Sequence, residues 1–293
     1  MRILLTGATG FIGRTLVSRL SKNHELSMVV RHPESRAPDG AQVVVMDLAR
    51  SASTMSLPAA VDAIIHLAQA NVRFPESADE LLAVNTTATQ RLLDYGRRAG
   101  ARQFILASTG DVYGRRVGAA KETDAAHPSD YYAVTKYAAE LLTSAYSSYM
   151  NPCILRLYQP YGPGQTGRLI PKLAERIAGR NPVRINKDDG PRLTPTYVDD
   201  VARAIERAID SCCAGTLNIA GDREVTMREL AEEIGRVIGS EPLFSQTGDQ
   251  SGDIAGNNSL MKQALGEWEM TPLPDGLLRT FKDKEGSSWQ ARV

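Results

Sequence analysis

The chain has 293 residues, 42% hydrophobic and 23% charged, so it can bury a sizeable core and has the composition of a soluble globular protein. Thirty-four basic residues balance thirty-four acidic ones, which argues against nucleic acid or an anionic membrane as a partner. With no signal sequence and no apolar run near the roughly 20 residues of a membrane span, we expect a cytoplasmic protein. The cysteines, Cys153, Cys212 and Cys213, have neither metal-ligand spacing nor the even count of a disulfide framework, so we expect no metal site and a structural role for the Cys212–Cys213 pair.

Short apolar runs alternate with helical patterns through the first half of the chain. The predicted strands lie at residues 3–5, 26–30, 43–46, 63–67, 104–107 and 154–157, and the predicted helices at 11–21, 79–98 and 131–149. Uniformly apolar runs of this length suit strands buried on both faces. The alternation therefore predicts an α/β fold with a doubly wound parallel Rossmann sheet.

The pattern changes after residue 161. Turn-forming residues crowd 161–167, followed by predicted helices at 169–178, 198–209 and 226–238 and a strand at 216–219. The last of these helices opens with a capping box, TMRE, and a polar stretch continues to residue 259. We expect a dinucleotide-binding domain formed by residues 1–165, with 196–221 returning to it, and a smaller, discontinuous α/β substrate lobe formed by 166–195 and 222–293.

A glycine turn follows the first predicted strand. The segment GATGFIG at 7–13 has the spacing GxxGxxG and leads directly into a helix. A pyrophosphate needs backbone N–H groups and a helix N-terminus brought close, and side chains would obstruct that approach. The turn therefore predicts a nicotinamide dinucleotide held by Gly7, Thr9, Gly10, Phe11, Ile12 and Gly13.

The tips of the next two strands select the cofactor. The second strand ends in MVVR at 28–31, and Arg36 follows, where an acidic residue would bind the ribose 2′-OH of NAD. Because arginine accommodates a 2′-phosphate, Arg31 and Arg36 predict a preference for NADP(H), with NAD(H) as the alternative. Asp47 and Leu48, after the third strand, are expected beside the adenine.

A tyrosine and a lysine share one helix face in the segment YAVTK at 132–136. A nearby ammonium and the positive ring of the oxidised cofactor are expected to lower the pKa of Tyr132, so that it can exchange a proton with a substrate hydroxyl. Ser108 and Thr109 end the fifth strand, where side chains face the ligand crevice. We expect Thr109 to hydrogen-bond the same substrate oxygen.

These pieces, in this order, resemble the extended short-chain dehydrogenase/reductase family, especially its nucleotide-sugar epimerases, dehydratases and reductases. The resemblance covers nearly the whole chain and rests on GATGFIG at 7–13, HLAQA at 66–70, NTTAT at 85–89, STGDVYG at 108–114, YAVTK at 132–136, RLYQPYGPG at 156–164, TYVDDVA at 196–202, Gly266 and GLL at 276–278. It implies that Tyr132 is the catalytic acid/base, Lys136 its partner and a ribose ligand, and Thr109 a substrate ligand.

The resemblance also implies the rest of the site and the assembly. Further cofactor contacts would come from Leu67, Ala68, Gln69, Ser108, Tyr158 and Pro160, and further contacts to a nucleotide-sugar substrate from Asp111, Gln159, Arg168 and Arg192. Family members commonly form a homodimer through the helices predicted at 79–98 and 131–149. Leu92, Leu141 and Leu142 on those helices suit such an interface, and they equally suit packing on the sheet.

Departures from the family pattern narrow the reaction. Family 4,6-dehydratases carry an Asp-Glu pair after the catalytic threonine, and Gly110 and Asp111 stand there instead, which argues against a dehydratase. Arg31 argues against an epimerase that retains NAD, and the segment 247–252 lacks a second arginine for the substrate diphosphate. An epimerase and a 4-ketoreductase acting at C4 of the sugar both remain open, as do an NADPH-dependent reductase of a non-sugar carbonyl and a non-catalytic NADP sensor.

Overall fold

The structure is a computed structural model that describes residues 1–32, 40–50, 56–70, 72–186, 189–248 and 252–282. Arg36, one of the expected cofactor ligands, lies outside the described residues. In the part of the chain that is described, no helix combines the length and the apolar character needed to cross a membrane.

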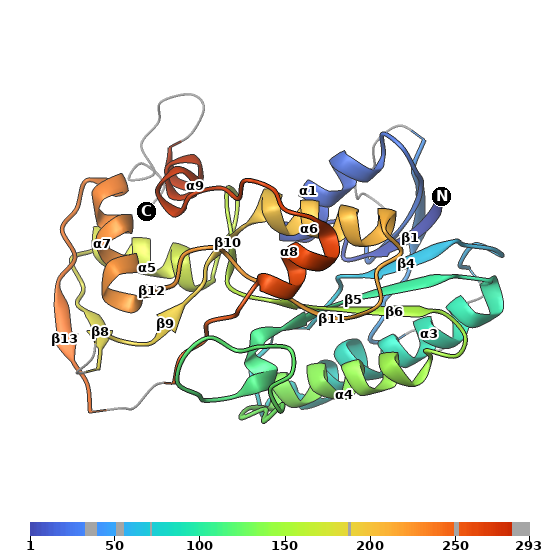
Figure 1. The fold of residues 1–293 in the computed structure, drawn as a ribbon, viewed down its shortest axis with the longest axis horizontal. Coiled ribbons are helices and arrows are strands. Elements are labelled where there is room, and N and C mark those ends of the chain that lie inside the picture. The colour runs from blue at the N-terminus through green and yellow to red at the C-terminus, as the bar shows by residue number, and fades with distance from the viewer. Residues whose placement is uncertain (33–39, 51–55, 71, 187–188, 249–251, 283–293) are drawn as a thin grey trace.

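A seven-stranded sheet forms the centre of the larger part of the molecule (Figure 1). Its order is β3-β2-β1-β4-β5-β6-β11, and every neighbouring pair is parallel. The strands are β1 (Arg2–Thr6), β2 (Glu25–Val30), β3 (Gln42–Val45), β4 (Ala63–His66), β5 (Gln103–Thr109), β6 (Asn151–Leu157) and β11 (Gly215–Ile219). The predicted Rossmann sheet is confirmed, and its order reverses between β1 and β4, where such sheets bind ligands.

Helices cover both faces of this sheet (Figure 1). On one face, α1 (Phe11–Leu20), α6 (Val198–Asp210) and α8 (Ser259–Leu265) bury a core that includes Leu16, Ile205 and Met261. On the other face, α3 (Ala88–Ala99) and α4 (Tyr131–Ala145) bury a core that includes Leu92 and Ala139. The strand side chains are apolar on both faces because both are covered.

The second half of the chain builds a smaller group of elements, at the left of Figure 1. Its helices are α5 (Leu169–Ala178), α7 (Met227–Ile238) and α9 (Leu273–Phe281), around a separate hydrophobic core. Short strand pairs complete it: β7 (Pro160–Tyr161) with β10 (Thr196–Tyr197), β8 (Val183–Ile185) with β13 (Phe244–Gln246), and β9 (Arg192–Leu193) with β12 (Val225–Thr226). The capping box is present: Thr226 and Glu229 each accept from the other's backbone N–H.

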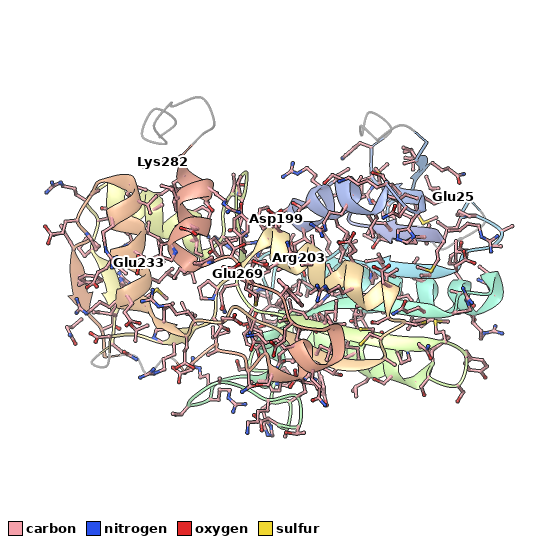
Figure 2. All side chains as sticks on the ribbon, turned by 45° about the horizontal axis from the view of Figure 1, so that its top comes forward. Glu25, Asp199, Arg203, Glu233, Glu269 and Lys282 are labelled. Carbon is pink, nitrogen blue, oxygen red and sulfur yellow. The ribbon has the colours of Figure 1, made fainter. Side chains whose placement is uncertain are left out.

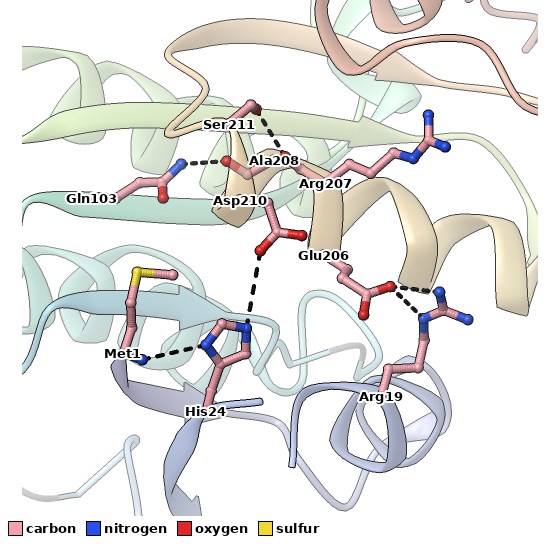
Figure 3. A network of polar contacts seen from close by, with 9 residues as sticks. All are labelled: Met1, Arg19, His24, Gln103, Glu206, Arg207, Ala208, Asp210 and Ser211. Atoms are coloured by element: carbon pink, nitrogen blue, oxygen red, sulfur yellow. Dashed lines mark hydrogen bonds and ion pairs between the residues drawn. The ribbon is translucent and has the colours of Figure 1, made fainter. Parts of the chain in front are cut away.

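Helix α6 packs on the main sheet, and its first residue, Val198, packs into the core of the smaller group. In Figure 2 its residues Asp199 and Arg203 are drawn near Glu269 in the middle of the molecule, between Glu233 of α7 and Glu25 at the start of β2. Polar contacts join α6 to the first βαβ unit: Arg19 Nε donates to Glu206 at 2.8 Å, and His24 lies 4.0 Å from Asp210 (Figure 3). The helix therefore connects the dinucleotide fold to the second half of the chain.

Four features differ from the sequence-based expectation. The helix predicted at 131–149 ends at Ala145 and continues as turns, and the polar stretch before residue 259 contains the short strand β13. Helices α8 and α9 follow where none was expected. Although residues 222–293 were assigned to the substrate lobe, Met261 and Leu265 pack into the core of the main sheet. The two-domain division stays a prediction.

Candidate active site

The glycine turn after β1 leaves no space for side chains. Gly7 has φ +73°, and a Cβ there would lie 2.6 Å from the backbone nitrogen of Ala68. At Gly13 a Cβ would lie 2.1 Å from the carbonyl oxygen of Gly7. Helix α1 follows Gly10, and no described side chain caps its first N–H groups. A close turn against an uncapped helix N-terminus fits a pyrophosphate.

The remaining residues of the turn divide between solvent and core. Thr9 and Gly10 are exposed, whereas Phe11 and Ile12 are partly buried. Both apolar side chains pack against the hydrophobic core of the smaller group of elements, around α5, α7 and α9. The start of α1 therefore faces the junction between the two groups.

The loop after β4 is tied to the glycine turn. The Thr6 hydroxyl lies 2.6 Å from His66 Nδ1 and accepts a hydrogen bond from the Ala68 backbone N–H at 3.2 Å. Burial lowers the pKa of His66 to about 3, so the ring is neutral. The Leu67 backbone N–H also donates to the carbonyl oxygen of Thr6, at 3.2 Å. The loop that starts with Leu67 and Ala68 is thereby held beside the expected pyrophosphate position.

The tips of β2 and β3 carry the residues expected to contact the adenosine half. Arg31 is exposed directly after β2. Asp47 is partly buried after β3, where it accepts from the Ala49 backbone N–H at 2.9 Å. Leu48 packs against the core beneath α3 and α4. An arginine and an acidic side chain therefore stand at neighbouring strand ends on the cofactor side of the sheet.

The end of β5 presents a hydroxyl–carboxylate pair. Thr109 donates from Oγ1 to Asp111 Oδ2 at 2.9 Å and accepts from the Asp111 backbone N–H at 3.2 Å. Burial raises the pKa of Asp111, and the charge of Asp130 adds to the rise. Ser108, one residue earlier, points to the other face of the strand and donates to Glu140 Oε1 at 2.5 Å. Thr109 therefore lies toward Asp111, whereas the Ser108 hydroxyl is used internally.

Gly110, between Thr109 and Asp111, leaves space for an aromatic ring. A Cβ at Gly110 would lie 2.4 Å from the ring of Tyr158, which is buried. The space next to Thr109 is therefore filled by an aromatic ring, and an acidic side chain at residue 110 would displace it.

Helix α4 brings Tyr132 close to Asp111. Asp130 caps the helix by accepting from the Ala133 backbone N–H at 2.8 Å, which positions its first turn. The Tyr132 hydroxyl donates to Gln69 Oε1 at 2.8 Å, so the phenol reaches the loop after β4. Tyr132 thus lies between the cofactor loop and the Thr109–Asp111 pair.

The electrostatic environment of Tyr132 differs from the expectation. Burial is the main cause that raises its pKa, and the negative charges of Asp111 and Asp130 raise it further. The Arg168 guanidinium acts in the opposite direction. In the chain alone, burial and the carboxylates therefore outweigh Arg168, and the lowering expected beside the oxidised cofactor stays a prediction.

Lys136 is buried one turn after Tyr132. Its Nζ donates to the carbonyl oxygen of Ala107 at 2.6 Å. Burial lowers its pKa to about 8, and the carboxylate of Glu140 opposes that fall. Glu140 is in turn held by Arg156, with Nη2 2.6 Å from Oε2, both side chains less than a tenth exposed. A buried network thus lies directly behind the lysine.

The loop after β6 carries three of the expected ligands. The ring of Tyr158 packs between Gly110 and Gly256, and its hydroxyl has no partner among the described residues. Gln159 has φ +34°, and its buried Oε1 is also without a partner in the described part. Pro160 lies in β7, and its carbonyl oxygen accepts from Gln165 at 2.6 Å. The Tyr158 ring thus belongs to the interior, while Gln159 keeps a free acceptor.

The two expected substrate arginines have different surroundings. Arg168 is exposed at the start of α5, close enough to Tyr132 to lower the pKa of its phenol. Arg192 is also exposed and pairs with Glu224 at 3.0 Å. Asp253 accepts from the backbone N–H groups of Arg192 and Gly118, at 2.8 and 2.7 Å. Arg168 therefore lies near Tyr132, whereas Arg192 belongs to the network around Asp253.

Asn85 is a functional candidate that our site prediction missed. Its buried side chain accepts from the Ala70 N–H at 2.8 Å and donates to the Ala70 carbonyl at 3.3 Å and to Thr135 Oγ1 at 3.1 Å. Thr135 in turn donates to the carbonyl oxygen of Tyr132. Asn85 therefore links the loop after β4 to the first turns of α4. The asparagine in the NTTAT segment was its only sequence signal.

Known proteins with similar sequences and folds agree on the family. Residues 3–220 match the NAD dependent epimerase/dehydratase family. An uncharacterized UDP-glucose epimerase of Bacillus subtilis, YtcB, is 28% identical, covering 94% of this chain and 96% of the relative. The structure of MoeE5 in complex with UDP-glucuronic acid and NAD superposes with a TM-score of 0.82 at 29% identity, covering 96% and 97% of the two chains.

A second solved structure points the same way. The UDP-glucose 4-epimerase of Thermus thermophilus, in complex with NAD, has a TM-score of 0.81 at 26% identity, over 96% of this chain and 97% of that one. The family match spans the glycine turn, Thr109, Tyr132 and Lys136. The chain therefore belongs to the NAD-dependent epimerase/dehydratase family, which confirms its resemblance to the extended short-chain dehydrogenases/reductases.

Proposed function

We propose that the protein is an NAD(P)-dependent epimerase or oxidoreductase that acts on a nucleotide-activated sugar, with hydride exchange at a ring carbon, C4. The observation that carries this proposal is the placement of Tyr132. Its phenol lies between the loop after β4, through Gln69, and the carboxyl end of β5, close to Asp111 and Arg168. A substrate carbon placed there would meet both a proton-transfer group and the nicotinamide.

The chain's own residues would divide the chemistry as follows. The bound nicotinamide supplies the hydride acceptor and donor. Tyr132 takes the proton of the substrate hydroxyl as the alcohol is oxidised and returns it on reduction. Thr109, turned from Asp111, donates a hydrogen bond to the same oxygen. Lys136 holds the ribose, and its charge favours the phenolate once the site has closed around the cofactor.

The cofactor preference is proposed from the tip of β2. Arg31 is exposed there, as expected of a ligand for a 2′-phosphate, and supports NADP(H) over NAD(H). The solved relatives were described with NAD, so NAD(H) is the alternative. We expect Arg31→Asp to reduce the NADPH-over-NADH affinity ratio by at least about tenfold, because a charge-assisted contact is lost. Lys22→Asp, at the far end of α1, should leave the ratio unchanged; an unchanged ratio in Arg31→Asp would refute the preference.

The substrate class is proposed from two kinds of support. The relatives named above act on or bind UDP-sugars. In this chain a positive charge near Tyr132 comes from Arg168, and a second positive charge comes from Arg192. Gln159 adds a buried acceptor without a partner among the described residues. A dehydratase is disfavoured because the Tyr158 ring fills the space beside Gly110.

Turnover on a panel of sugars tests the proposal. Purified protein would be incubated with UDP-, GDP-, dTDP- and ADP-sugars, with and without added NADPH. A product isomer without net change of the cofactor means an epimerase, and net NADPH oxidation by a keto-sugar means a reductase. Turnover only on non-sugar carbonyls, or tight NADP(H) binding without turnover on any compound, would contradict the proposal in favour of the non-sugar reductase or the sensor.

We also propose that the protein is a homodimer. The exposed apolar residues of α2 (Ala78–Leu82) and α4 support it: Leu82, Val134 and Leu141 are 45%, 46% and 56% exposed. Leu92 and Leu142, expected on the outer faces, instead pack on the sheet, Leu92 fully buried and Leu142 partly. Only part of the expected interface therefore faces outward.

A further inference from the structure

Two of the three cysteines meet at the edge of the main sheet. Cys153 lies in β6 and pairs in register with Gly215 of the edge strand β11, and Cys213 precedes that residue by two positions. Adjacent strands are only about 4.8 Å apart. Cys213 packs against the core cluster that contains Cys153. Each thiol is also the first cause of the pKa shift of the other. The fold therefore brings the two cysteines together at this edge of the sheet.

The two thiols have unequal surroundings. Cys153 is fully buried, and burial together with its contact to Cys213 raises its pKa. Cys213 is partly exposed, and its interaction with Cys153 lowers the pKa of its thiol. A thiolate that solvent can reach is the form that reacts with oxidants. Cys213 is thus suited to react first, and Cys153 to react with the product.

The turn that carries Cys213 is held in place at the end of α6. Gln103 of β5 donates from Nε2 to the carbonyl oxygens of Ala208, at 2.7 Å, and Cys213, at 3.1 Å; Figure 3 shows the first of these bonds. The Cys213 backbone N–H also donates to Ala208, at 3.0 Å. Cys212 has φ +51°, and its exposed sulfur accepts from Asn151 at 3.5 Å. The turn therefore directs Cys213 inward and Cys212 outward.

We propose that Cys153 and Cys213 form a reversible intramolecular disulfide when the protein meets a peroxide. The Cys213 thiolate attacks one oxygen of the peroxide and the O–O bond breaks, which leaves a sulfenic acid on the protein. The departing hydroxide takes up the proton that the Cys213 thiol had released and becomes water. The Cys153 sulfur then attacks the sulfur of Cys213, the S–O bond breaks, and the departing hydroxide takes the Cys153 proton. The two sulfurs lose two electrons, and hydrogen peroxide becomes two waters.

The cross-link would close a loop of the chain that carries several of the expected substrate ligands. Residues 154–212 lie between the two cysteines and include Gln159, Arg168 and Arg192. Because a disulfide restricts the unfolded chain, oxidation is expected to raise the midpoint of thermal unfolding. The pair lies toward the amino-terminal end of β6. The glycine turn lies at the opposite edge of the sheet, where the carboxyl ends of the strands meet. The proposal therefore does not depend on the proposed function.

Peptide mapping tests the proposal directly. Reduced protein would be treated with hydrogen peroxide, alkylated, digested without reductant and analysed by mass spectrometry. We expect a peptide pair joined through Cys153 and Cys213, lost on reduction, together with an upward shift in the thermal midpoint. The matched control Cys212→Ala should keep both effects, while Cys213→Ala and Cys153→Ala should lose them.

Other outcomes would overturn the proposal. Three results would show that Cys153 does not react with the sulfenic acid. They are a disulfide between Cys212 and Cys213, a disulfide between two chains, and oxidation of Cys213 to sulfinic acid without a cross-link. A cross-link in wild type that persists in Cys213→Ala would assign it to Cys212 instead.

Discussion

Lys136 keeps its charge in a buried place because Glu140 lies one turn further along α4. Burial lowers the lysine's pKa from 10.5 to about 8, and the carboxylate limits that fall. The ammonium is therefore present below about pH 8 and lost above it. Ser108 and Arg156 position the carboxylate through hydrogen bonds of 2.5 and 2.6 Å.

Glu140→Gln should shift the pH profile of turnover. Without the negative charge the pKa of Lys136 falls further, so the high-pH limb of kcat should move to lower pH. The variant should also lose roughly 3–5 kcal/mol of stability in urea unfolding, because Arg156 is left as a buried charge without its partner. Glu140→Asp keeps the charge and should keep the limb near that of wild type. A Glu140→Gln enzyme that is less stable but has an unchanged pH profile would limit Glu140 to a structural role.

Residue types at known spacings gave the candidate site, but not its electrostatics. Tyr132, Lys136 and Thr109 were proposed from a helical spacing and a strand end, and the glycine turn from its own spacing. The raised pKa of Tyr132 could not be foreseen, because it depends on burial and on Asp111 and Asp130, which approach the phenol only in the folded chain. The inward orientation of the Tyr158 ring was missed as well, because it too depends on contacts that form only in the folded chain.

The helical run before β5 contains one turn of π-helix. Helix α2 continues without a break through η1 (Ala83–Thr87) into α3. The wider turn carries Asn85, whose side chain faces the loop after β4 and the first turn of α4. Insertions of this kind are frequent at functional sites. Here the π-helical turn carries the residue that links the loop after β4 to α4.

Asn85→Ala should loosen that connection. It removes the hydrogen-bond partner of the buried Ala70 backbone N–H and C=O. We therefore expect the free energy of unfolding in urea to fall by about 2–4 kcal/mol, together with lower turnover. Thr86→Val removes a single bond, from the Thr86 hydroxyl to the Thr135 carbonyl, and should cost about 1 kcal/mol. Equal stability of the two variants would contradict the role assigned to Asn85.

Element prediction succeeded where the pattern was continuous. The strands of the main sheet are short β-branched runs bounded by polar residues, and all seven predicted runs form strands. The final helices were missed because α8 is only seven residues long and Pro272 and Gly276 interrupt the apolar pattern around α9. Their position depends on tertiary contacts instead: Asp200 accepts from Trp268 and from the backbone of Thr271 and so holds the chain between the two helices.

At the scale of the whole molecule, the site lies where the sheet order reverses and the two groups of elements meet. β1 and β4 supply the turn and the loop for the dinucleotide, while β5 and α4 supply Thr109 and Tyr132. The smaller group approaches through Phe11 and Ile12. The α/β alternation predicted this arrangement of the sheet, but it gave no information on how the second half of the chain packs against it.

The proposed homodimer is tested by one exposed side chain. Val134 and Leu141 are seven residues apart on α4 and share a face. Leu141→Lys should convert a dimer to a monomer in light scattering after gel filtration, because a charge would be buried in an apolar interface. Leu278→Lys, on the similarly exposed Leu278 of α9, should leave the dimer intact. A monomeric wild type, or a dimeric Leu141→Lys, would contradict the proposed interface.

The most direct test of the account is the rate at which the protein reduces its oxidised cofactor with a nucleotide sugar. Wild type and Tyr132→Phe would be loaded with NADP⁺ or NAD⁺ and mixed with the sugar, and the absorbance of reduced nicotinamide followed in a single turnover. Tyr131→Phe is the matched control, because that ring stacks on Phe74 at 4.6 Å next to the catalytic residue. We predict that Tyr132→Phe slows the reaction by about 100-fold to 10,000-fold with cofactor affinity retained, while Tyr131→Phe stays near wild type. Reduction by Tyr132→Phe at the wild-type rate would contradict the account.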